Sequence, residues 1–227
     1  MSGLAVVFDL DDTLYPERQF ALCGFRAAAS WARAELGLHG LDADMTRLLD
    51  AGHLGRLFAM ALEERLPGRH SPQQVQGLIA AYRACEPELT LFDDARWALD
   101  HYAGGGPLGL ITDGTHAMQL KKVRALALEQ HFEEIVYTDL LGEGRAFAKP
   151  HPRSFELMEV ALADPGGRFV YVGDNPAKDF AAPNARGWIT VQVVRAGGIH
   201  DATRMIDGGA PQHKIAALTE LPGVLGS

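Results

Sequence analysis

Short apolar runs separated by helical patterns are the feature that most limits how this chain can fold. The runs lie at Leu4–Phe8, Leu108–Ile111, Ile135–Tyr137, Phe169–Val172, Thr190–Val194 and Ile215–Leu218. Each has the length of a buried strand and is bounded by polar residues or glycine. Between the later runs, apolar side chains recur at helical spacing, as in Met118–Ala127 and Phe155–Leu162. This alternation predicts an α/β fold with a parallel sheet.

The stretch from Glu17 to Pro87 interrupts the alternation. It contains four helical patterns and no plausible strand, with the helices predicted at Phe20–Leu36, Leu41–Leu49, Leu54–Leu66 and Ser71–Ala84. We therefore predict an α/β core formed by residues 1–15 and 91–227. Residues 16–90 are predicted to form an all-helical insertion.

Composition narrows the class of protein. Apolar residues make up 47% and charged residues 22%, as in ordinary globular proteins. The formal charge of −8 argues against a nucleic-acid partner, because such proteins gain affinity from basic surfaces. No apolar segment has membrane-spanning length and no signal peptide is evident, so we expect no membrane partner and a cytoplasmic location.

Cys23 and Cys85 lack metal spacing and are predicted to be two buried free thiols.

Acidic side chains follow two of the predicted strands. Asp9 and Asp11 come directly after the first, and Asp174 and Asp179 follow the run at Phe169–Val172. Ligands bind at the carboxyl ends of strands in open α/β sheets, so these carboxylates are candidates for one shared site. Each pair could instead cap the following helix. The consistent order of the groups along one sheet favours the shared site.

Two further groups fit the same site. Thr112, Asp113 and Gly114 end another strand, where a hydroxyl and backbone N–H groups could hold phosphate oxygens. Lys149 supplies a cation ahead of a helix and is followed by Pro150. Taken singly, a threonine cap and a solvated lysine are the simpler interpretations of these residues.

Together these motifs resemble the haloacid dehalogenase-like hydrolase superfamily. Its pattern is Asp-x-Asp-x-Thr, a Ser or Thr after a strand, a Lys, and Gly-Asp-x(4)-Asp. All four parts occur here in order and span residues 9 to 179. The resemblance implies a Rossmann-like core with helices on both faces of the sheet, and it identifies the insertion as the helical cap of this superfamily.

The resemblance also implies roles for these residues. Asp9 would be the nucleophile that forms an aspartyl-phosphate, and Asp11 the general acid and then the general base. Thr112, Lys149 and the amides of Asp113 and Gly114 would hold the phosphate. The cofactor implied is Mg²⁺, bound by Asp9, Asp174 and the backbone carbonyl of Asp11, and supported by Asp179.

The activity expected is therefore Mg²⁺-dependent hydrolysis of a small phosphate ester, with a nucleotide or a sugar phosphate as substrate. A phosphomutase shares every one of these motifs and stays open. A 2-haloacid dehalogenase is disfavoured because Asp11 is present, and a non-catalytic binding protein is disfavoured because no key group is missing. The sequence does not indicate an oligomeric state.

Substrate choice is expected to depend on the insertion. The Leu-Tyr-Pro continuation after Asp-x-Asp-x-Thr is similar to that of pyrimidine 5′-nucleotidase-like members. Tyr15 and Pro16 are expected near the hinge, and candidates for pocket-facing groups are Arg18, Phe20 and Arg26. The histidines at 151, 200 and 213 lack paired metal spacing and are expected to be surface or structural residues.

Overall fold

A computed structural model of the chain describes residues 3–162 and 167–226. In these residues one parallel sheet of six strands has the order β3-β2-β1-β4-β5-β6. The strands are β1 (Leu4–Phe8), β2 (Leu108–Thr112), β3 (Glu134–Tyr137), β4 (Arg168–Gly173), β5 (Ile189–Val193) and β6 (His213–Ile215). The α/β fold class with a parallel sheet is confirmed.

The last strand differs from its prediction. It ends at Ile215, whereas the apolar run suggested a strand over Ile215–Leu218. The side chain of Glu220 accepts hydrogen bonds from the amides of Ala216 and Ala217, at 3.1 and 2.9 Å, and a 3₁₀-helix, η2, follows at Leu218–Glu220. Because a side chain binds these two amides, the chain turns away from the sheet after Ile215.

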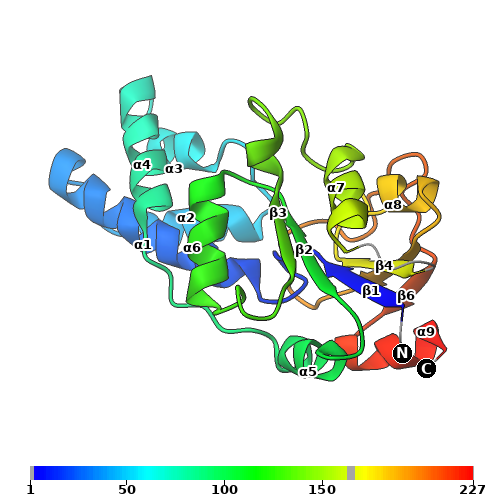
Figure 1. Cartoon of the computed structure of the whole chain (residues 1–227). Helices are drawn as coiled ribbons and strands as arrows, with labels where there is room; N and C mark the ends of the chain where they lie inside the picture. The colour runs from blue at the N-terminus through cyan, green and yellow to red at the C-terminus, as the bar shows by residue number, and fades with distance from the viewer. Residues whose placement is uncertain (1–2, 163–166, 227) are drawn as a thin grey trace. The chain divides into compact units, whose positions relative to one another are not determined.

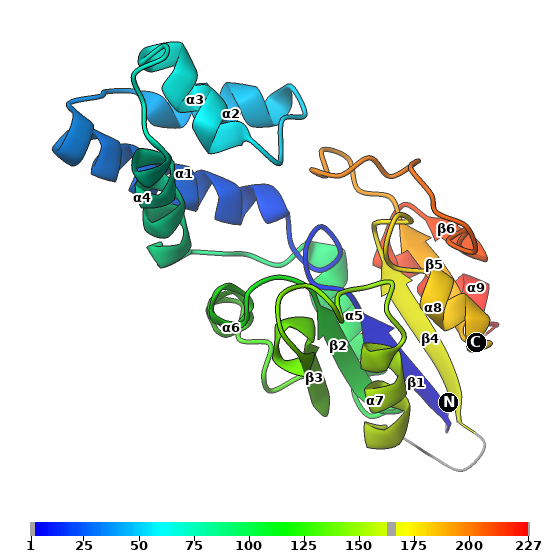
Figure 2. The same ribbon diagram turned by 90° about the horizontal axis from the view of Figure 1, so that it is seen from above.

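Strand β1 lies in the middle of the sheet and is buried along its whole length. It pairs with β2 on one side and with β4 on the other, as Figure 2 shows. The chain passes from β1 to β2 and β3, then returns to β4 on the opposite side of β1. In open α/β sheets, ligands bind outside the carboxyl ends of the strands at such a reversal of strand order, which here is beside β1.

Helices cover both faces of the sheet. Figure 1 shows α7 (Arg153–Ala161) and α8 (Ala181–Ala185) on one face and α5 (Asp93–Tyr102) and α9 (Leu221–Leu225) on the other. The remaining helical elements around the sheet are α6 (His116–Ala125) and the 3₁₀-helix η1 (Thr138–Leu141). Alternate strand residues point to opposite faces. One buried cluster thus combines strand and helix side chains, namely Ala5, Val7, Ile111, Val136, Phe155, Met158, Leu162, Tyr171, Phe180, Ala182 and Trp188.

The chain divides into two compact units. The core unit comprises Met1–Glu17 and Leu89–Ser227, and the helical unit comprises Arg18–Glu88. Residues 18–88 are all described and contain no strand; their helices are α1 (Glu17–Leu36), α2 (Leu41–Asp50), α3 (Leu57–Arg65) and α4 (Pro72–Ala84). Ser71 caps α4 by accepting from the amide of Gln74, whose side chain binds the Ser71 amide in return.

Aromatic packing inside the helical unit explains one of its helix-internal glycines. The ring of Tyr82 lies against Gly24 so closely that an added Cβ would come within 2.2 Å of it. Phe20 meets the same ring edge-on, with centroids 5.6 Å apart, and is 1% exposed. Phe20 thus belongs to the packing of this unit. The expectation that it faces a pocket is wrong. Cys85 is buried, but Cys23 is only half-buried, so the expectation of two buried thiols is wrong for Cys23.

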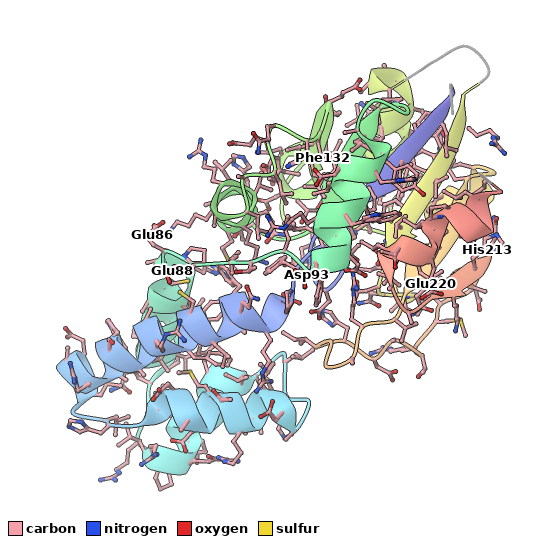
Figure 3. All side chains as sticks on the ribbon, turned by 90° about the horizontal axis from the view of Figure 1, so that it is seen from below. Glu86, Glu88, Asp93, Phe132, His213 and Glu220 are labelled. Atoms are coloured by element: carbon pink, nitrogen blue, oxygen red, sulfur yellow. The ribbon has the colours of Figure 1, made fainter. Side chains whose placement is uncertain are left out.

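The two segments of the core unit that lead into and out of the helical unit are bonded to each other. The amide of Phe92 donates to the carbonyl of Leu14 at 3.0 Å, which ties the outgoing and returning segments together. Figure 3 labels Glu86 and Glu88 on the returning segment and Asp93 at the start of α5. None of the helices in the described residues combines the length and the apolar content needed to cross a bilayer.

Candidate active site

Asp9 lies where β1 ends, in the middle of the sheet. Its amide extends the ladder by donating to the carbonyl of Val172 at 2.8 Å. The carboxylate is 2.7 Å from Nζ of Lys149 and 3.4 Å from Nζ of Lys178. Burial alone would raise the pKa of Asp9, but the two ammonium groups outweigh it and lower the pKa to about 2. Asp9 is therefore a buried carboxylate that stays ionised at neutral pH.

Lys149 is the internal cation of the site. Its side chain is 0% exposed, and Nζ lies 2.7 Å from Asp9, 2.8 Å from Asp179 and 2.8 Å from the hydroxyl of Tyr171. Burial opposes its charge, but Asp179 and Asp9 raise the pKa of Lys149 above its ordinary value. The simple interpretation of a solvated surface lysine is thus wrong for this residue.

Three carboxylates meet beside Lys149. One oxygen each of Asp9, Asp174 and Asp179 lie within 4.8 Å of one another, and all three residues are buried. Oδ1 of Asp174 is buried without a hydrogen-bond partner, whereas Oδ2 of Asp179 accepts from the amide of Asn175 at 2.9 Å. Burial and the neighbouring carboxylates raise the pKa of Asp174 far above its usual value. A cluster of hard oxygen donors with one unsatisfied atom suits a divalent cation.

The loop after β2 is fixed by its own side chains. Thr112 is the last residue of β2, and its Oγ1 accepts a hydrogen bond from Nε2 of Gln119. The carboxylate of Asp113 accepts from the hydroxyl of Thr138 at 2.8 Å and from the amide of Lys149 at 3.1 Å. Asp113 therefore joins the loop after β2 to the segments that follow β3, including the one that carries Lys149.

Asp11 is held by three donors within the core unit. The hydroxyl of Tyr15 and Nζ of Lys122 approach its Oδ1 at 2.6 and 2.7 Å. Nε2 of Gln119 donates to its Oδ2 at 2.9 Å. Asp11 thus lies on the side of the site formed by α6, and both of its oxygens accept hydrogen bonds.

Asp12 shapes the loop that carries these acids. It has the positive φ of 52°, and its carboxylate accepts from the amide of Glu17 at 2.9 Å and from that of Ile199 at 2.7 Å. Burial raises the pKa of Asp12 to about 6 despite these two bonds. Glu17 in turn pairs with His200 at 3.5 Å, so the loop after β5 is tied to the start of α1.

The structure places all eight predicted site residues at the ends of β1, β2 and β4 or in the segment before α7. These residues are Asp9, Asp11, Thr112, Asp113, Gly114, Lys149, Asp174 and Asp179. Sequence reasoning missed four of their partners. Lys178 lies within the Gly-Asp-x(4)-Asp motif and could have been noticed there, whereas Tyr171 looks like any core residue of a buried strand. Gln119 and Lys122 are one turn apart on α6, and only their contacts with Asp11 distinguish them.

Comparison with known proteins identifies the family of this chain. Residues 4–187 match the family model described as haloacid dehalogenase-like hydrolase. The chain belongs to this family. A glyceraldehyde 3-phosphate phosphatase of Methanopyrus kandleri is 29% identical over 97% of this chain and 96% of its own. A ribulose-1,5-bisphosphate 5-phosphatase of Halopiger xanaduensis is 29% identical over 96% and 97% of the two chains.

A solved structure of a haloacid dehalogenase-like hydrolase supports the fold. The magnesium-bound crystal structure of the hydrolase YfnB from Bacillus subtilis aligns with a TM-score of 0.67 over 100% of both chains, at 17% identity. At this identity the likeness concerns the fold alone. The family model confirms the predicted family, and the structural likeness confirms its Rossmann-like α/β core.

Proposed function

We propose that this haloacid dehalogenase-like hydrolase is a Mg²⁺-dependent phosphatase of a small phosphorylated metabolite, acting through an aspartyl-phosphate on Asp9. The observation that carries the proposal is the state of Asp9. It is a buried carboxylate with a pKa of about 2, placed at the end of the central strand and beside two further carboxylates. Such a group is ionised, fixed and able to attack phosphorus.

The residues present fit a magnesium ion. The unpartnered Oδ1 of Asp174 and the carboxylate of Asp9 would bind it, together with the backbone carbonyl of Asp11, while Asp179 would support them. Bound there, Mg²⁺ would shield the repulsion between an anionic nucleophile and an anionic phosphate. The buried negative charge of this cluster provides the driving force for binding a cation.

The chain's own groups account for both half-reactions. An oxygen of Asp9 attacks phosphorus, the bond from phosphorus to the ester oxygen breaks, and Asp11 donates a proton to that oxygen. Asp11 then takes a proton from water, the water oxygen attacks phosphorus, and the bond to Asp9 breaks. Inorganic phosphate leaves and both carboxyl groups return to their starting state.

The remaining groups would stabilise the transferring phosphoryl group. The hydroxyl of Thr112, the amides of Asp113 and Gly114 and the ammonium of Lys149 are the donors for its oxygens. Lys149 already contacts Asp9 at 2.7 Å, so one cation serves the nucleophile and the phosphate. Fixed donors of this kind lower the barrier because they need no rearrangement during the reaction.

The relatives narrow the substrate class. Those reported above act on phosphate esters of a three-carbon and a five-carbon sugar, by their names. This favours a sugar phosphate over a nucleotide as the substrate of this chain. We further propose that the helical unit is the cap that selects the substrate, and that the enzyme works in the cytoplasm.

The experiment that tests the function is phosphate release from a panel of sugar phosphates, nucleotides and small acid phosphates, with Mg²⁺ and with EDTA. We expect release that requires the metal and falls at least ~10³-fold in Asp9→Asn, because the amide cannot form the covalent intermediate. Equal circular dichroism spectra of the two proteins serve as the folding control. Release of similar speed from Asp9→Asn would disprove the nucleophile.

A further inference from the structure

Helix α6 buries polar side chains where a helix beside a sheet normally buries apolar ones. Its buried residues are Gln119, Lys122 and Val123. The side chain of Lys122 is 3% exposed. Burying an amide and an ammonium group costs free energy unless each finds a partner. Packing alone therefore does not explain why this face of α6 is polar. The hydrogen-bond partners of Gln119 and Lys122 do explain it.

Both residues donate to the same carboxylate, that of Asp11. Nζ of Lys122 lies 2.7 Å from Oδ1 of Asp11, and Nε2 of Gln119 lies 2.9 Å from Oδ2. Tyr15 donates to Oδ1 as well, at 2.6 Å. Donors on both oxygens fix the plane of the carboxyl group, as well as its position. A group that must hand a proton to one particular oxygen benefits from such fixation.

Gln119 makes a second bond that reaches the next motif. Its Nε2 carries two hydrogens and contacts both Oδ2 of Asp11 and Oγ1 of Thr112. A threonine hydroxyl has one hydrogen and two lone pairs. Because Gln119 is the donor in this bond, the bond does not use the hydrogen of the Thr112 hydroxyl, which can be donated to another acceptor. In the proposed function that acceptor is a phosphate oxygen.

We propose that Gln119 and Lys122 are positioning residues for catalysis. They hold the carboxyl group of Asp11 in the orientation needed to protonate the leaving oxygen, and Gln119 in addition directs the hydroxyl of Thr112 towards the phosphate. Both residues act through Asp11 and Thr112, and neither of them gives or takes the transferred proton. The inference rests on the proposed function. It adds the residues that position Asp11, the general acid of that function.

The test compares two substrates in the variants Lys122→Met and Gln119→Met, which keep most of the side-chain length while removing the donors. 4-Nitrophenyl phosphate releases a stable phenolate and needs little help from an acid, whereas glycerol phosphate releases an alkoxide that must be protonated. We expect kcat/KM for glycerol phosphate to fall ~10-fold or more relative to that for 4-nitrophenyl phosphate in both variants. In Gln119→Met the KM for both substrates should also rise, because Thr112 is no longer oriented.

Arg124→Met is the matched control, since Arg124 is on the same helix but its side chain is 66% exposed. Its ratio of the two kcat/KM values should equal that of the wild type. The ratio does not depend on how much of a preparation is folded, so a destabilised variant still gives an answer. An unchanged ratio, or a faster reaction of glycerol phosphate, in either methionine variant would overturn the proposal.

The same data separate this inference from the function on which it rests. A wild-type protein that hydrolyses neither ester in Mg²⁺ would contradict the proposed phosphatase. Wild-type hydrolysis of both esters with unchanged ratios in the variants would leave the phosphatase standing and refute only the roles of Gln119 and Lys122.

Discussion

Asp174 lies in surroundings that disfavour its charge. Its Oδ1 is buried without a partner, and burial together with Asp179 raises the pKa far above its ordinary value. A carboxyl group whose pKa is raised by folding is destabilised in its ionised form, so at neutral pH the charge opposes folding. The folded chain thus bears a local cost that a bound cation would relieve.

Asp174→Asn should therefore make the metal-free protein more stable, by a few degrees in Tm, because the amide carries no charge. The variant should also lose the stabilisation that Mg²⁺ gives the wild type, which is about 2.7 kcal/mol at a hundredfold excess over Kd. Thermal unfolding with EDTA and with Mg²⁺ measures both effects. The proposed metal site would be refuted if Mg²⁺ left the Tm of the wild type unchanged, or if it still raised the Tm of Asp174→Asn.

At the scale of elements, the carboxyl end of β4 is built around close contact with Asp179. Gly173 ends this strand, and an added Cβ would lie 2.6 Å from Oδ2 of Asp179. The same oxygen accepts from the amide of Asn175, and the other lies 2.8 Å from Lys149. The absence of a side chain at Gly173 is thus a condition for the position of Asp179.

Gly173→Ala should push the Asp179 carboxylate out of place and weaken Mg²⁺ binding by ~10-fold or more, as is usual when a group supporting metal ligands is disturbed. Isothermal titration with Mg²⁺ measures the change. Gly223→Ala is the control, because an added Cβ there meets nothing within 4 Å. Equal Mg²⁺ affinities of the Gly173→Ala protein and the wild type would show that Asp179 does not support the metal.

The elements also show why some features were predictable from sequence and others were not. Buried parallel strands such as β1 and β4 are nearly continuous apolar runs, so their positions were evident. The bounds of edge strand β6 were harder to predict, because the strand contains His213 and Lys214 and ends where the side chain of Glu220 binds two backbone amides. The apolar pattern of the strand does not indicate that contact. The motif acids could be placed because they directly follow strands. Gln119 and Lys122 could not, because their roles depend on contacts with Asp11 more than 100 residues away.

At the scale of the whole molecule, the proposed catalytic residues are confined to one of the two units. Every proposed catalytic and metal-binding residue belongs to the core unit, and residues 18–88 supply none of them. The helical unit has its own buried residues, including Leu41, Met45, Leu62 and Leu78. Each unit therefore has a separate source of stability, and a ligand that contacts one unit should stabilise that unit first.

Hydrogen exchange should reveal this division. Mg²⁺ without substrate should slow exchange in β1, β4 and the segments that follow them, and leave the amides of α2, α3 and α4 unchanged. Mass spectrometry of peptides from the protein with EDTA and with Mg²⁺ gives the comparison. Equal protection of the helices would contradict binding by the core unit alone.

The hydrogen bond from Phe92 to Leu14 has a consequence for how such a protein can diverge. Everything between these two residues is, for the core unit, one long loop whose ends are already clamped together. The entropy cost of closing a loop grows only with the logarithm of its length. A lineage could therefore lengthen, shorten or replace this loop at little cost to the sheet, and acquire new substrates while the catalytic apparatus stays the same.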